Sequence, residues 1–461
     1  MPILGAFLVP HPPIILPEVG RGEEQKIQKT VDAYREVARR IEALKPDTVI
    51  VTSPHATMYA DYFHISPGES AKGDLSRFGV SGVSAEVKYD SEFVQVLSDT
   101  AGEMQLPAGT FGERDKSLDH GILIPLRFLQ EYRNDYKLVR IGLSGLSVLD
   151  HYRLGKCIAQ TAEKLERRVV FVASGDLSHK LTDDGPYGFA EEGPKFDKEV
   201  TEAMAKGDFL RFLTFSPDFC DAAAECGLRS FIIMAGALDG KSVQPELLSY
   251  EGPFGVGYGV CAFTITGDDE SRHFDVVYES EQQKRLNTIK ANEDAYVRLA
   301  RLSLETYIKT GKQAELPSNL PEEMRNRRAG AFVSLKKYGE LRGCIGTIGP
   351  VTDCIAEEIL RNAVSAGTDD PRFSPVTEEE LSDLVYSVDV LAESEPIDSI
   401  AELDVKRYGV IVKSGYKCGL LLPNLEGVNT PEQQVSIAMK KAGIRQGESC
   451  SLERFEVVRH K

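Results

Sequence analysis

Runs of apolar residues alternate with helical patterns at the start of the chain. Residues 3–10 (ILGAFLVP) and 45–55 (KPDTVIVTSPH) predict buried strands, and residues 23–44 between them carry apolar side chains at helical spacing. A strand, a helix and a strand in this order form a βαβ unit, whose right-handed crossover makes the strands parallel and brings their carboxyl ends to one edge of a sheet. His11 and His55 lie just beyond these strands. We therefore expect both imidazoles at that edge.

The alternation continues further along the chain. Residues 136–146 and 167–179 predict two more strands, with a helix over 150–166 between them, and polar residues again follow the second strand. A last apolar strand is expected at 258–266. This order of elements indicates an α/β domain with a mixed central sheet and flanking helices.

A polar stretch at about 268–286 marks a domain boundary, since 461 residues are more than one core normally accommodates. We expect a first domain over 1–270, a linker over 271–286 and a second domain over 287–461. The second domain opens with a helical pattern over 293–310 and continues with short strand patterns. These patterns, GAFVSLKKYGELRGCIGTI, LVYSVDVL and YGVIVKSGYKCGLLLP, predict a smaller α+β domain with antiparallel pairing.

Composition and charge narrow the classes of partner. The net charge of -17 would repel a phosphate backbone, so we expect no nucleic-acid partner. No apolar run approaches the roughly 20 residues that span a bilayer, and the apolar N-terminus lacks a basic region and a cleavage site, so we expect no membrane association. The eight cysteines show no C-x-x-C spacing. Reduced thiols in the cytoplasm fit this pattern.

The environment of His11 suits a metal ligand. Pro10, Pro12 and Pro13 flank it, remove backbone donors and stiffen the loop. A single histidine in such a turn is more often structural, but a second histidine at the same sheet edge favours a site. A non-haem Fe(II) site uses two histidines and one carboxylate and leaves positions open for substrate and dioxygen. His11 and His55 would supply the nitrogens.

Four motifs of the first domain resemble those of LigB-like class III extradiol dioxygenases and the related Memo family. They are LVPHPPIILPEVG, VTSPHA, SLDHGILIPL and SGDLSHKL, in the order seen in these families. The resemblance implies that His11 and His55 ligate the metal, that His179 acts as acid or base beside it, and that His120 lies on the substrate and dioxygen side. It also implies an aromatic substrate whose hydroxyl oxygens bind Fe(II), with Zn or Cu as alternative metals.

The third ligand stays open between two neighbours. The dioxygenase family places a glutamate before a helix that ends in Gly-Ala, and FCDAAAECGLRSFIIMAGAL matches with Glu225. The Memo family places a cysteine in a Cys-Gly pair at this segment, which matches Cys226. Glu225 is also explained as a carboxylate at a helix N-terminus, and Cys226 as a small buried hydrophobe. Asp176, three residues before His179, either orients that ring or forms a turn.

The second domain resembles the AMMECR family. The matching motifs are LRGCIGTI, AVSAGTDDPRFSPVTEEEL, LLLPNLEGV and TPEQQVSIAMKKAGI. Arg342 would favour the thiolate form of Cys344 if the two side chains converged, giving a nucleophilic or redox group. A buried inert thiol is the alternative. The charged turn TDDPRFSPV is either solvated or part of a polar groove that faces Cys344.

A fusion of these two domains resembles the AmmeMemoRadiSam set, whose third member is a radical SAM protein. This chain lacks C-x-x-x-C-x-x-C, so such a partner would be separate. The first hypothesis is an Fe(II)-dependent extradiol dioxygenase that acts on a dihydroxylated aromatic or related small molecule. The alternatives are a Memo-like metal-binding or redox protein without catechol cleavage, and an interaction module that recruits the metal domain to the radical SAM protein. A homo-oligomer remains open.

Overall fold

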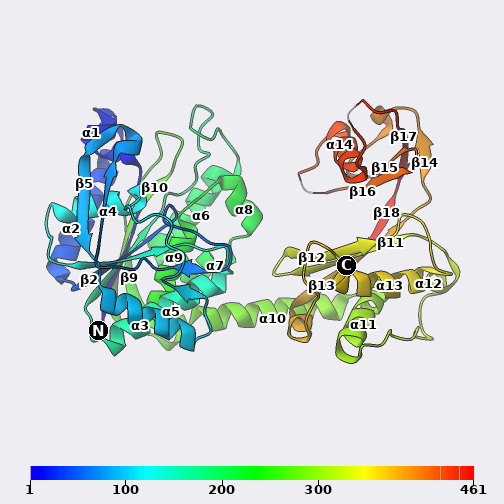
Figure 1. The fold of residues 1–461 in the computed structure, drawn as a ribbon, viewed down its shortest axis with the longest axis horizontal. Coiled ribbons are helices and arrows are strands. Elements are labelled where there is room, and N and C mark those ends of the chain that lie inside the picture. Colours follow the sequence, from blue (N-terminus) through cyan, green and yellow to red (C-terminus); the bar gives the residue numbers. More distant parts are fainter. Residues whose placement is uncertain (1, 426, 446) are drawn as a thin grey trace. The chain divides into compact units, whose positions relative to one another are not determined.

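The computed structural model describes residues 2–425, 427–445 and 447–461, and its elements are labelled in Figure 1. The chain divides into two compact units, 1–281 and 282–461. Among the described residues, no helix combines the length and the apolar character that crossing a membrane requires.

The first unit is built on a mixed six-stranded sheet, in agreement with the expected fold class. Four neighbouring strands run parallel and two antiparallel strands follow on one side. In spatial order they are β7 (Lys137–Gly142), β2 (Thr48–Ser53), β8 (Val169–Ser174), β1 (Ile3–Val9), β10 (Tyr258–Asp268) and β9 (Lys241–Glu251). The carboxyl ends of β1, β2 and β8 therefore share one edge, as the βαβ pattern predicts.

Helices cover both faces of this sheet. Alternate residues of β2 enter two different cores, because successive strand side chains point to opposite faces: Ile50 joins one core, and Val49 and Val51 join the other. The helices of the first core are α3 (Ser91–Glu103), α5 (Val148–Lys164), α6 (Glu192–Lys206), α7 (Phe209–Thr214) and α9 (Leu228–Ala237). Those of the second are α2 (Gln28–Leu44) and α4 (His120–Gln130).

Helices α5 and α9 pack backbone against backbone. A Cβ atom on Gly155 would lie 2.0 Å from the carbonyl oxygen of Ile233, and one on Gly236 would lie 1.9 Å from that of Tyr152. Only glycine allows this approach at either position. The position of α9, which begins two residues after Cys226, is therefore set by its contact with α5.

Shorter elements complete the first unit. They are α1 (Pro17–Gly20), β3 (Phe63–His64), the β4 (Ser70–Leu75) and β5 (Val80–Lys88) hairpin, β6 (Ala108–Gly109) and α8 (Pro217–Ala223). The β4–β5 hairpin packs over α4 on the side of the second core.

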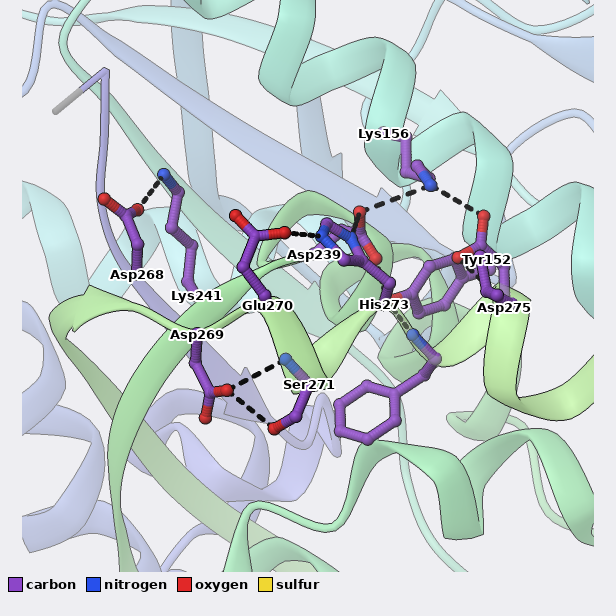
Figure 2. Close-up of polar contacts among 12 residues, drawn as sticks. Tyr152, Lys156, Asp239, Lys241, Asp268, Asp269, Glu270, Ser271, His273 and Asp275 are labelled. Carbon is purple, nitrogen blue, oxygen red and sulfur yellow. Dashed lines mark hydrogen bonds and ion pairs between the residues drawn. The ribbon is translucent and has the colours of Figure 1, made fainter.

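The stretch expected as a linker is part of helix α10 (Phe274–Asn292). A polar network anchors its start to the first unit (Figure 2). Asp239 accepts hydrogen bonds from the hydroxyl of Tyr152 at 2.6 Å and from Nδ1 of His273 at 2.8 Å, and Lys156 Nζ lies 2.6 Å from Asp275. The first turn of α10 is thus fixed on α5 and on the end of α9.

The second unit contains two antiparallel sheets, in agreement with the expected α+β class. The first is β12 (Glu340–Gly346), β11 (Ala331–Lys337), β13 (Leu384–Leu391) and β18 (Val457–His460). The second is β14 (Glu395–Ile397), β17 (Ser451–Phe455), β15 (Gly409–Ser414) and β16 (Lys417–Leu421). The helices are α11 (Ala295–Thr310), α12 (Glu322–Asn326), α13 (Ile355–Thr368) and α14 (Pro431–Ala442).

Candidate metal centre

Three side chains from separate segments meet at the carboxyl edge of the first sheet. The Nε2 atoms of His11 and His55 lie 3.0 Å apart, and Cys226 Sγ lies 3.7 Å from Nε2 of His11. The three donor atoms all lie within 4.8 Å of one another. They come from the end of β1, the loop after β2 and the residues just before α9. Two imidazole nitrogens and a sulfur thus face a common point.

The hydrogen bonds of His11 determine its tautomer. The hydroxyl of Ser174 donates to the carbonyl oxygen of Gly121 at 2.6 Å, so Ser174 Oγ can only accept the hydrogen bond from Nδ1 of His11 at 3.0 Å. Nδ1 therefore carries the proton. Burial, reinforced by His55 and His179, lowers the pKa of His11 well below its usual value, so the ring is neutral. Its Nε2 presents a lone pair, as a metal ligand requires.

The structure brings Cys226, and not Glu225, to the two histidines. The carboxylate of Glu225 accepts the backbone N–H of Leu228 at 2.7 Å and so caps the start of α9. Ala224 adopts a left-handed conformation with φ of 52°, and the chain turns there before the two residues. Burial raises the pKa of Glu225 to about 7. The expected carboxylate ligand is thus directed to the helix terminus.

The sulfur of Cys226 has a hydrogen-bond donor of its own. The backbone N–H of Asp176 donates to Sγ at 3.3 Å. Burial, with the carboxylates of Asp176 and Glu225, raises the pKa of the Cys226 thiol well above its usual value. A metal cation would replace the thiol proton and remove this penalty, because metal ligation couples to deprotonation.

His179 lies beside this group with its ring held by the main chain. Its Nδ1 lies 2.5 Å from the carbonyl oxygen of Ala224 and must donate to it, which leaves Nε2 free to accept a proton. The sequence left Asp176 either orienting His179 or forming a turn. The Asp176 carboxylate instead accepts the backbone N–H of His11 at 2.7 Å, and burial raises the pKa of Asp176 to about 6.

His120 adds a third imidazole next to the two donor rings. Its ring stacks on that of His55 with centroids 4.0 Å apart and meets His11 edge-on at 5.3 Å. Burial, followed by His55 and His11, lowers the pKa of His120 to about 3, so it is neutral. Two exposed aromatic residues border the site: Phe78 contacts His120 at 5.1 Å and Tyr187 contacts His179 at 5.3 Å.

The donors fit a transition-metal ion. Two imidazole nitrogens 3.0 Å apart repel each other through their lone pairs unless a proton or a cation lies between them. A set of two nitrogens and one sulfur matches the ligands of zinc and of copper, and a backbone N–H on the sulfur is a common supporting contact.

Three supporting residues were not predicted from the sequence. Ser53 and Ser174 are the hydroxyl residues that end buried strands, and Arg140 is the charged residue inside the apolar strand KLVRIG. All three are buried. A polar residue at the end of an apolar strand, or a charge within one, was the available signal.

Cys344 in the second unit lies on β12 in a polar setting. Its thiol is 3.2 Å from the hydroxyl of Ser334, and its backbone N–H donates to Asp370 at 2.9 Å. Arg372 pairs with Asp370 at 2.7 Å and donates to the carbonyl oxygen of Cys344 at 3.4 Å. The charged turn around Asp370 therefore holds the strand at Cys344.

Arg342 is directed elsewhere. Its guanidinium pairs with the carboxylate of Glu380, with Nη2 at 2.9 Å and Nε at 3.0 Å from the two oxygens, and this arginine lowers the pKa of Glu380 to about 2. The pairing is bidentate and partly buried, which makes it strong. The guanidinium of Arg342 thus binds Glu380, which does not support the alternative in which it converges on Cys344.

Comparison with known proteins defines the class of both units. The family model described as the catalytic LigB subunit of aromatic ring-opening dioxygenase matches residues 5–261, and the AMMECR1 model matches residues 297–460. The chain therefore belongs to the LigB family, with an AMMECR1 domain fused to it.

Relatives match all or part of the chain. A protein of Clostridium acetobutylicum is 44% identical over the full length of both chains, and a protein of Thermotoga maritima is 50% identical over 37% of this chain and 98% of its own. A solved Pyrococcus horikoshii protein is 35% identical, with a TM-score of 0.34, over 36% of this chain and 88% of that one. A solved Escherichia coli K12 protein is 15% identical, with a TM-score of 0.39, over 57% of this chain and 99% of that one.

Proposed function

We propose that the first domain is a Memo-like metal-binding redox protein in which His11, His55 and Cys226 hold a transition-metal ion. The observation that carries this proposal is the position of the Cys226 sulfur, 3.7 Å from Nε2 of His11, while Glu225 caps α9. A thiolate with two imidazoles favours copper or zinc over the carboxylate-supported Fe(II) of ring-cleaving oxygenases. A bound copper or iron ion would supply one-electron redox chemistry.

The residues around the donors have separate tasks. The N–H of Asp176 stabilises negative charge on the Cys226 sulfur, and Ser174 holds His11 in the tautomer that offers Nε2. Because Nδ1 of His179 bonds the Ala224 carbonyl, Nε2 is the ring atom that would take a proton from a bound substrate. Phe78 and Tyr187 border the opening and favour a planar or aromatic substrate group.

A second candidate is extradiol cleavage of a dihydroxylated aromatic by an Fe(II) form of the same site. The positions of His120 and His179 beside the donors favour it, because the reaction needs a proton acceptor next to the metal. In this case Glu225 would have to leave the helix terminus to reach the ion. That movement would cost the capping hydrogen bond to Leu228.

Metal reconstitution without oxygen tests the proposal. The protein is loaded separately with Cu(I), Zn(II), Fe(II) and Co(II), and we expect about one ion per chain. Cys226→Ser should abolish the sulfur-to-metal charge-transfer absorption of the Co(II) form, whereas Glu225→Gln should retain it. Cys220→Ser is the matched control, since its thiol belongs to the same segment but lies outside the donor group.

The opposite order of effects would contradict the proposal. If Glu225→Gln weakens Fe(II) binding and Cys226→Ser does not, the carboxylate is the third ligand. Oxygen consumption with catechols by the Fe(II) protein would then favour the dioxygenase.

A further inference from the structure

Arg140 is a charged residue enclosed in the first unit. It lies in the middle of β7 with 1% of its surface exposed. Its Nη2 is 3.3 Å from Oδ2 of Asp119, and its Nη1 donates to the carbonyl oxygen of Asp115 at 3.3 Å. A buried arginine needs a counterion, and Asp119 supplies it. Asp119 stands at the N-terminus of α4, yet its side chain makes no capping hydrogen bond to that helix.

The other oxygen of Asp119 is linked to His55 through hydrogen bonds. Oδ1 accepts the hydroxyl of Ser53 at 2.6 Å, and Ser53 Oγ accepts the backbone N–H of His55 at 3.1 Å. Gly121 makes room for this contact, since a Cβ atom there would lie 2.3 Å from Ser53 Oγ. The loop that carries His55 is therefore tied to the start of α4.

Segment 119–121 is also linked to His11 through hydrogen bonds. The carbonyl oxygen of Gly121 accepts the hydroxyl of Ser174, and Ser174 accepts Nδ1 of His11. His120, between Asp119 and Gly121, stacks on the ring of His55. Segment 119–121 thus contacts both donor histidines through one hydroxyl each.

We infer that Arg140 and Asp119 form a buried positioning pair, which fixes segment 119–121 and through it the separation of the His11 and His55 nitrogens. Arg140 is a positioning residue, since it acts through Asp119 and Ser53. The inference rests on the proposed metal site for its functional meaning. The chain of contacts itself is made by protein atoms alone.

Ser53→Ala is the sharpest test, because it removes only the hydroxyl that links Asp119 to His55. Thr52→Val is the matched control: Thr52 is the preceding residue of β2, it is equally buried, and its hydroxyl has no partner among the described residues. We expect Ser53→Ala to weaken Zn(II) binding by about tenfold to a hundredfold, the usual effect of losing a residue that supports a ligand, and Thr52→Val to leave it unchanged. Arg140→Lys should retain more affinity than Arg140→Met.

A second readout needs no metal. In the metal-free protein, the ring signals of His55 and His120 in a histidine-labelled NMR spectrum should move in Ser53→Ala and not in Thr52→Val. Shifted signals in a protein that binds no metal would support the positioning pair and reject the proposed metal function. Unchanged signals together with unchanged Zn(II) affinity in Ser53→Ala would overturn the positioning pair and leave the metal site standing.

Discussion

Replacing Asp197 by asparagine should change how the stability of the first domain depends on pH. Asp197 lies on α6, where its Oδ1 accepts the backbone N–H of Ser178 at 2.7 Å and its Oδ2 is 2.7 Å from the hydroxyl of Tyr250. It is almost fully enclosed, and burial raises its pKa from 3.8 to about 7. Across the acidic range Asp197 is therefore a neutral carboxylic acid, and it holds the backbone N–H of Ser178, the residue before His179.

The sign and size follow from proton linkage. Because the folded pKa is raised, the stabilising contribution of the protonated group is fully present below about pH 4, falls as pH rises, and is lost above about pH 7. The maximum slope is about 1.4 kcal/mol per pH unit, so the loss across this window is at most about 4 kcal/mol. Asparagine imitates the protonated acid: its oxygen accepts from Ser178 and its amide donates to Tyr250.

Urea unfolding from pH 4.5 to 8, with a chelator present, measures this effect. Asp197→Asn should match the wild type near pH 4.5 and exceed its unfolding free energy by about 1 to 4 kcal/mol at pH 8. Groups that titrate identically in both proteins do not contribute to the difference between their unfolding free energies. Equal pH dependence of the two proteins would refute the reasoning.

Three further predictions address the other sites. His179→Ala should keep the bound metal but slow turnover of any substrate found by roughly a hundredfold to ten-thousandfold, as measured by steady-state kinetics; loss of metal would make His179 a ligand. Iodoacetamide should alkylate Cys344 in the native protein faster than the buried Cys157. Arg372→Ala should change the alkylation rate of Cys344, because Arg372 contacts the Cys344 carbonyl. Reaction of Cys344 only after denaturation would indicate an inert thiol. Hydrogen bonds to Asp239 and Glu270 raise the pKa of His273, so its contribution is present below pH 6.5 and lost as pH rises through the raised value. Amide protection factors in the first turn of α10, which correct for the intrinsic acceleration of exchange with pH, should therefore fall above neutral pH, and His273→Gln should show no such fall.

Strong periodic patterns determined most of the predicted elements. The pattern LVYSVDVL coincides with β13, and the βαβ reading of the N-terminus corresponds to β1, α2 and β2. Strand β9 was not predicted, because its sequence KSVQPELLSYE contains a proline and few consecutive apolar residues, as an edge strand tolerates. The polar stretch near 280, expected to be a linker, contains the boundary between the two units, and it is helical because its charged residues favour helix as much as loop.

The candidate site could be predicted in part from the sequence. Parallel strand geometry is sufficient to place His11 and His55 together, since it fixes where strand ends meet. Choosing between Glu225 and Cys226 required the left-handed turn at Ala224, which no local pattern predicts for an alanine. The alternative in which Arg342 acts on Cys344 rested on proximity in sequence, whereas Glu380, 38 residues away, binds Arg342. Partners contributed by distant segments are not visible in a single sequence.

The backbone contact between α5 and α9 makes the candidate metal site sensitive to remote mutation. Any side chain at Gly155 would push against the carbonyl of Ile233 and displace α9. The segment before α9 carries Cys226, so the displacement would move the sulfur while both imidazoles stayed beyond the ends of β1 and β2. A substitution at Gly155 would thus change which metal the candidate site prefers, because a longer bond to one ligand alters metal selectivity without exchanging any ligand.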